Sequence, residues 1–239
     1  MDVIDLSEFA TTLPEGHEAL RRSIKDTIDV HSAHSDLKIA HDSAARFISL
    51  NKSEAFPREF VEDCGLALLV TGILFYVRAT KSSSDHRKTF DLRARFDDLE
   101  RQDHDLLVRL RDDALAHYGP GQLGTETIRE DSLFFSISVQ KLFSTSRNIC
   151  GSDSLGHTIR RQSQRALILM QRLYEQKQII LLGQLKDLPA SEAIDAAFQS
   201  AIFQLSTLVG PEMANQIESG PFVGAKRLSG GTKKPRKSE

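Results

Sequence analysis

No proline interrupts the chain from Glu15 to about Leu50, and this stretch constrains the fold more than any other feature of the sequence. Its apolar residues recur at helical spacing, with polar residues between them: Val30, Ala33, Leu37, Ala40, Ala44 and Ile48. A pattern of this period creates one apolar face, which a helix must bury against other elements. It therefore predicts one long amphipathic helix, or two abutting ones, packed in a larger helical assembly.

Helical patterns return in four later stretches, each bounded by residues that start or stop helices. Pro57 suits the first turn of the second helix, because a first turn needs no backbone N–H donor there. The Gly-Pro-Gly sequence at 119–121 cannot continue the third. The expected helices cover residues 60–77, 90 or 97 to 117, 156–188 and 191–209.

Between Glu130 and Cys150 the apolar period changes from helical to alternating. Every second residue is apolar from Leu133 to Val139, which is typical of a strand with one buried face. We therefore expect a mainly α protein, an antiparallel helical bundle with a small β-hairpin insertion at about 131–149. The expected organisation is an N-terminal segment (1–14), one helical domain (15–218) and a basic, disordered tail (219–239).

Composition limits the classes of function. The 239 residues are 40% apolar and 27% charged, which is typical of a globular protein, and the net charge of −2 gives no global attraction to nucleic acid or membranes. The apolar run at 64–77 is shorter than the roughly 20 residues that cross a bilayer, so we expect a helix buried on most sides and no membrane partner. A signal-like N-terminus is lacking and only two cysteines are present, so a cytoplasmic location is expected.

The last segment, from Ala225, combines basic residues with glycine, serine and proline. Such a composition cannot bury enough apolar area to fold. Its cations could contact RNA or DNA phosphates nonspecifically, or they could simply be solvated. The candidate RNA-binding residues are Lys233, Lys234, Arg236 and Lys237.

Arg111 and His117 form the most informative pair, because a helical projection places both at the apolar side of the third helix. A guanidinium on a buried face costs stability unless it is paired or binds an anion. In one interpretation Arg111 pairs with an acid of a neighbouring helix, such as Glu62 or Asp63, and His117 caps the helix end. In the other, the two side chains flank a groove and act on a phosphate.

The second interpretation points to RNA cleavage. A histidine can move the proton of a 2′-hydroxyl or of a leaving group, and a guanidinium can hold the phosphate through the transition state. If the same helix of a second subunit packed between Arg111 and His117, two such pairs would line one cleft across a two-fold axis. The chemistry requires no metal or other cofactor.

Other histidines suggest weaker sites. His31 and His34 have the spacing to share a metal, but no Cys or Glu completes a site, so we expect no metal; a polar face against another subunit is favoured. His104 lies seven residues before Arg111, and with Glu100 it could orient Arg111 or carry a proton, or it could be structural. Neither a Gly-x-Ser-x-Gly elbow nor a Walker loop is present.

The segment from Leu110 to His117 resembles the Arg-(polar)-x-x-x-Ala-His motif of the HEPN superfamily. An apolar helix ending in Arg-Ala, here at 76–79, precedes the motif helix in similar bacterial proteins, and a short β stretch and a long helix follow it. The resemblance spans roughly Phe60 to Leu188. It implies a bundle of four or five helices that dimerises through its motif helices, here at 97–117.

Many HEPN domains are metal-independent endoribonucleases of toxin, antiphage or RNA-processing systems, so the resemblance implies RNA as substrate. It maps Arg111 and His117 onto the catalytic pair and Asp112 onto the polar position after the arginine. A cognate antitoxin or another regulatory protein is a further partner that it allows. The alternative is a noncatalytic helical dimerisation or interaction module, in which Arg111 and His117 lock two subunits together.

Overall fold

The computed structural model describes residues 2–81, 88, 90–112, 122–123, 126–127, 129–136, 141–148 and 153–219. It divides the chain into two compact units. One combines Met1–Glu15 with Pro189–Glu239, and the other is the continuous segment Gly16–Leu188. The helices α6 to α8, which we expected in one domain over 15–218, thus group with the N-terminal segment.

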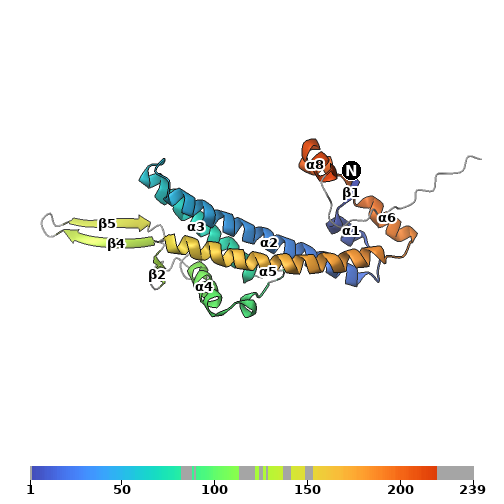
Figure 1. The fold of residues 1–239 in the computed structure, drawn as a ribbon, viewed down its shortest axis with the longest axis horizontal. Helices are drawn as coiled ribbons and strands as arrows, with labels where there is room; N and C mark the ends of the chain where they lie inside the picture. The colour runs from blue at the N-terminus through green and yellow to red at the C-terminus, as the bar shows by residue number, and fades with distance from the viewer. Residues whose placement is uncertain are drawn as a thin grey trace, which may run out of the picture. The chain divides into compact units, whose positions relative to one another are not determined.

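Three long helices form the body of the Gly16–Leu188 unit: α2 (Glu18–Asn51), α3 (Arg58–Thr80) and α5 (Asp153–Lys186). They run alongside one another, with α2 packed against both α3 and α5 (Figure 1). The expected helices at 15–50, 60–77 and 156–188 are confirmed, and α2 is one continuous helix. Pro57 was expected in the first turn of this helix; it is the N-cap residue, one position before α3 begins at Arg58.

Apolar side chains from all three long helices form a single core. Among the largest that are almost fully buried are Phe47, Leu37, Ile73, Tyr76, Ile159 and Met170. The α2 and α5 helices approach very closely at Gly156, where an added Cβ would lie 2.5 Å from a ring carbon of Phe47. Only a glycine allows this approach without displacing the ring.

The apolar helix α3 is buried on one face, not on most sides. Leu69 and Ile73 lie in the core, whereas Phe60 and Leu74 keep 47% and 42% of their surface exposed. Among the described elements, α3 packs mainly against α2, with smaller contacts to α4 and α5. Within the described part of the chain, α3 is also the one helix long and apolar enough to cross a membrane, a property that core helices share.

A short 3-10 turn (η1, Arg93–Arg95) leads into α4 (Asp98–Arg109), which packs against α3 and α5. Asp97 begins α4 with a capping box: its carboxylate accepts from the Glu100 N–H, and the Glu100 carboxylate accepts from the Asp97 N–H. These bonds satisfy N–H groups that lack helical partners, so the start of α4 is fixed by local sequence.

The β insertion is confirmed. Strands β4 (Arg129–Ser136) and β5 (Lys141–Asn148) pair antiparallel, from Arg129 opposite Asn148 to Ser136 opposite Lys141. A second small pair joins β2 (Gln122–Leu123) to β3 (Glu126–Thr127). The protein is therefore mainly helical with small antiparallel β elements, as its sequence predicts.

The other unit joins both ends of the chain. Strand β1 (Asp2–Ile4) pairs antiparallel with β6 (Ile202–Gln204), and Phe9 of α1 (Leu6–Thr12) stacks on Phe198 of α6 (Glu192–Ser200). Helices α7 (Leu205–Val209) and α8 (Pro211–Ser219) follow, separated by Gly210 with a φ of 81°. The expected single helix over 191–209 is therefore wrong, because β6 interrupts it to pair with β1.

Candidate functional site

The Arg-containing motif lies where the regular α-helix ends. After Arg109 the chain continues through residues 110–112 in a wider π-type turn. The N–H of Leu110 donates to the carbonyls of both Leu106 and Leu107, and the side chains of Leu107 and Leu110 are fully buried. Such widened turns are rare inside helices and are frequent at functional sites.

Arg111 is half-exposed, although the adjacent Leu110 is fully buried. Its side chain keeps 37% of its surface exposed, and Nη1 donates to Oδ1 of the adjacent Asp112 at 2.7 Å. The guanidinium is therefore partly exposed, whereas the helical projection placed it at the apolar side of the helix. The suggested pairing with Glu62 or Asp63 is wrong, since Arg111 pairs with Asp112.

Asp112 connects Arg111 to the end of another helix. Its second oxygen, Oδ2, accepts a hydrogen bond from Nζ of Lys81 at 2.6 Å. Lys81 follows the last residue of α3, and its backbone N–H donates to the Val77 carbonyl. Partial burial favours the neutral acid, but the hydrogen bonds from Lys81 and Arg111 outweigh it and lower the pKa of Asp112. The carboxylate is therefore charged at neutral pH.

The sequence motif does not reveal Lys81, which lies 31 residues before Asp112. The sequence signal that could have indicated Lys81 is its position at the end of an apolar helix, where the helix dipole favours cations. His117 lies outside the described residues, and so do the tail residues Lys233, Lys234, Arg236 and Lys237. The structure thus brings together Arg111, Asp112 and Lys81 of the candidate site.

Behind this cluster, a chain of hydrogen bonds crosses the interior between α5, α3 and α4. Nε2 of Gln162 donates to the Tyr76 hydroxyl at 3.1 Å, and that hydroxyl lies 2.7 Å from Nδ1 of His104. All three side chains are buried, with His104 5% exposed. Burial lowers the pKa of His104 and raises that of Tyr76, so both groups are neutral at neutral pH.

The sequence suggests that His104, with Glu100, could orient Arg111 or carry a proton, or that it could be structural, and its contacts favour the structural role. Glu100 does not bond to it; Glu100 completes the capping box and pairs with Arg165 at 2.9 Å. His104 is held against Tyr76 and Phe96, with ring centroids 5.8 and 5.6 Å away. It is therefore a structural residue of the interior and does not orient Arg111 by direct contact.

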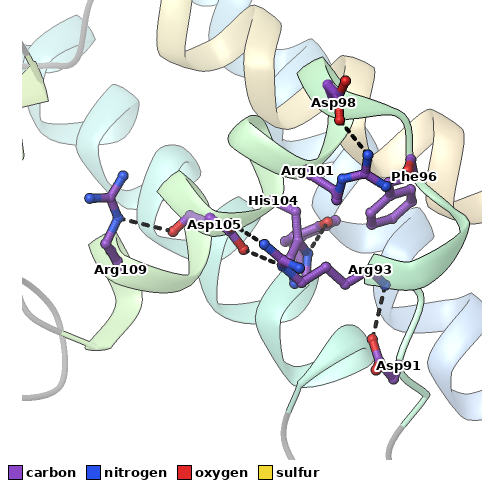
Figure 2. Close-up of polar contacts among 9 residues, drawn as sticks. Asp91, Arg93, Phe96, Asp98, Arg101, His104, Asp105 and Arg109 are labelled. Carbon is purple, nitrogen blue, oxygen red and sulfur yellow. Dashed lines mark hydrogen bonds and ion pairs between the residues drawn. The ribbon is translucent and has the colours of Figure 1, made fainter.

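Ion pairs hold the exposed face of α4 in place (Figure 2). Arg93 of η1 donates through both Nε and Nη2 to Asp105, each bond being 2.9 Å long. Arg109 points away along the helix, and its Nε donates to the Asp105 carbonyl at 3.4 Å. Buried Asp103 is paired with Arg161 of α5 on another side of the helix. The helix that carries the motif is thus fixed on two sides.

The histidine-rich face of α2 lines a shallow groove against α5, with a volume of about 590 Å³. His34, Lys38 and His41 contribute to it from α2, and Gln171 and Arg172 from α5. His31 instead packs against the Tyr174 ring, with centroids 5.3 Å apart. Among the residues that the structure describes, no group of three or more His, Cys, Asp or Glu side chains is placed to hold a metal ion.

No protein-family model, curated protein or solved structure matches this chain.

Proposed function

We propose that this protein is a HEPN-like, metal-independent endoribonuclease. The proposal rests first on the motif from Leu110 to His117, and one structural observation carries it further. Arg111 is half-exposed at a π-type turn, beside the end of a second helix, and is held by an adjacent carboxylate at 2.7 Å. A guanidinium in this position can receive a phosphate from solvent, which a sealed one could not.

In this proposal His117 and Arg111 divide the chemistry. His117 takes the proton of a ribose 2′-hydroxyl, whose oxygen then attacks the adjacent phosphorus; the bond to the 5′-oxygen breaks and that oxygen takes up a proton. Arg111 stabilises the negative charge on the phosphate oxygens during the attack. Asp112 positions the Arg111 guanidinium before RNA binds. The products are a 2′,3′-cyclic phosphate and a free 5′-hydroxyl.

We further propose that the protein acts as a homodimer through the motif helix. One observation on α4 supports this: Leu99 is 57% exposed, whereas Leu106 and Leu107 of the same helix pack in or against the core. Burial of this side chain by a partner helix would be favourable, because it removes apolar surface from water.

The test is RNA cleavage in the presence of EDTA, with products examined for the 2′,3′-cyclic phosphate. We expect Arg111→Ala and His117→Ala to lower the cleavage rate by about 10²-fold or more, as for the loss of a charge-stabilising or proton-transferring group. Arg109→Ala is the matched control, since Arg109 is exposed two residues away and its Nε donates to a backbone carbonyl of α4. It should retain cleavage.

Folding and oligomeric state are checked by circular dichroism and light scattering for each variant. Cleavage that persists in both folded Arg111→Ala and His117→Ala would refute the catalytic assignment. Failure of the intact protein to cut diverse RNAs, together with loss of the dimer in Arg111→Ala, would favour the noncatalytic module. In that alternative, the half-exposed Arg111–Asp112 pair belongs to a lock between subunits.

A further inference from the structure

The Asp112 carboxylate lies between two cations that come from different helices. Oδ1 accepts from Arg111 and Oδ2 from Lys81, so each oxygen of one carboxylate engages one cation. The backbone fixes both sides: Lys81 bonds through its N–H to Val77, and Leu110, beside Arg111, is anchored in the core. The backbone positions from which the two cationic side chains extend are therefore set by the fold.

The cations face solvent more than the carboxylate does. The side chains of Lys81 and Arg111 are 49% and 37% exposed, whereas that of Asp112 is 28% exposed. A molecule arriving from solvent thus meets two positive groups first. Ion pairs with this exposure contribute little to stability, because water competes for both partners, so an incoming anion can displace Asp112 at small cost.

A phosphodiester presents the same pattern of acceptors as this carboxylate. It carries one negative charge on two nonbridging oxygens of a single atom, as a carboxylate does. The guanidinium binds phosphate oxygens in a directed way and the ammonium acts as a point charge, so the two groups suit one phosphate together. The site as a whole carries a net charge of +1 with Asp112 in place.

We propose that Lys81 and Arg111 together bind one phosphodiester of an RNA strand, and that Asp112 is an internal anion which this phosphate displaces. This inference rests on the proposed function for the identity of its ligand. It adds Lys81 to the site as a positioning residue for the scissile phosphate. In this proposal Asp112 competes with RNA for the two cations and so lowers the affinity of the protein for RNA.

The experiment measures binding without cleavage. The probe is a fluorescein-labelled, single-stranded RNA with a 2′-O-methyl group on every nucleotide, which a 2′-hydroxyl mechanism cannot cut. Binding to the full chain is followed by fluorescence anisotropy over a series of NaCl concentrations. We expect Asp112→Asn to tighten binding by about three- to tenfold, because the exposed ion pairs it gives up are weak.

Lys81→Ala should weaken binding and reduce the slope of log affinity against log salt by about 0.7, the value for one contact to a single-stranded phosphate. Lys81→Arg should preserve most of the affinity. The matched controls are Asp105→Asn, which changes the charge of the same helix equally at the Arg93 pair, and Lys25→Ala, which removes an exposed lysine paired with Asp29 of α2.

If Asp112→Asn binds no tighter than Asp105→Asn, the proposal is overturned, and an undiminished salt slope in Lys81→Ala overturns it equally. Absence of binding by every variant also overturns it. If Asp112→Asn does not fold, the comparison of Lys81→Ala, Lys81→Arg and Lys25→Ala decides alone. Cleavage of unmodified RNA is measured separately. If the protein binds RNA as expected but does not cut it, the proposed function fails and the phosphate site stands. If it cuts RNA but Asp112→Asn does not tighten binding, the phosphate site fails and the proposed function stands.

Discussion

The close approach of α2 and α5 at Gly156 makes a sharp prediction about stability. Alanine at this position would place its Cβ 2.5 and 2.8 Å from two ring carbons of Phe47 and 3.3 Å from Cγ1 of Ile48. Both neighbours are buried, with Phe47 fully enclosed, so the ring cannot swing into solvent. Relief of the clash therefore requires a shift of one long helix against the other.

The expected change in the free energy of unfolding of Gly156→Ala follows from two opposed effects. Alanine favours a helix over glycine by about 0.5–1 kcal/mol. Overpacking of a filled core typically costs about 1–3 kcal/mol, and contacts this short fall at the upper end. We therefore expect Gly156→Ala to lower the free energy of unfolding by about 1–2 kcal/mol. Gly183, in the same helix, provides the control, because an added Cβ there meets no atom within 4 Å.

Urea unfolding followed by circular dichroism measures both variants. Gly183→Ala should be as stable as the original protein or more stable, by up to about 1 kcal/mol. Gly156→Ala should unfold at a lower urea concentration. Equal stability of the two alanine variants would show that α2 and α5 separate easily at this point, and it would refute the argument from close packing.

Two further predictions concern the interior hydrogen bonds. Tyr76→Phe removes the hydroxyl that contacts Nδ1 of His104 and Nε2 of Gln162. It should lower the free energy of unfolding by about 1–3 kcal/mol, because both buried groups lose a hydrogen-bond partner. The control Tyr174→Phe should change the free energy of unfolding little, and equal effects of the two variants in urea unfolding would contradict this. Burial lowers the pKa of His104 in the folded protein, so the unfolded chain takes up its proton first, and stability should fall as the pH drops below about 6.5. That fall should be smaller in a folded His104→Phe variant; an unchanged pH dependence would show that His104 does not cause it.

Local sequence patterns predict the helices well, since the apolar period and the residues at helix ends act over a few positions. Pro57 and the apolar residues of 60–77 place α3 (Arg58–Thr80) closely. The alternation from Leu133 to Val139 indicates the β4–β5 hairpin for the same reason. The expected helix at 191–209 fails because β6 pairs with β1, and a strand pair formed across the whole chain has no local signature.

In the candidate site too, local features can be predicted from the sequence and features that depend on tertiary packing cannot. Arg111 and Asp112 stand out in the sequence through a short motif, but regular helical geometry does not anticipate the π-type turn in which they lie. Lys81 joins them only through the packing of α3 against α4. Likewise, Tyr76 and Gln162 read as ordinary helical residues until the fold places them beside His104.

The unit built from both ends of the chain has a consequence for synthesis on the ribosome. Its strands β1 and β6 pair Asp2 with Gln204, residues 202 positions apart, while the whole of Gly16–Leu188 lies between its two parts. Translation delivers the intervening segment before α6 and β6 exist, so its long helices can pack while β1 still has no partner strand. Because β1 precedes this segment and β6 follows it, β1 completes its pairing only after Gly16–Leu188 has been synthesised.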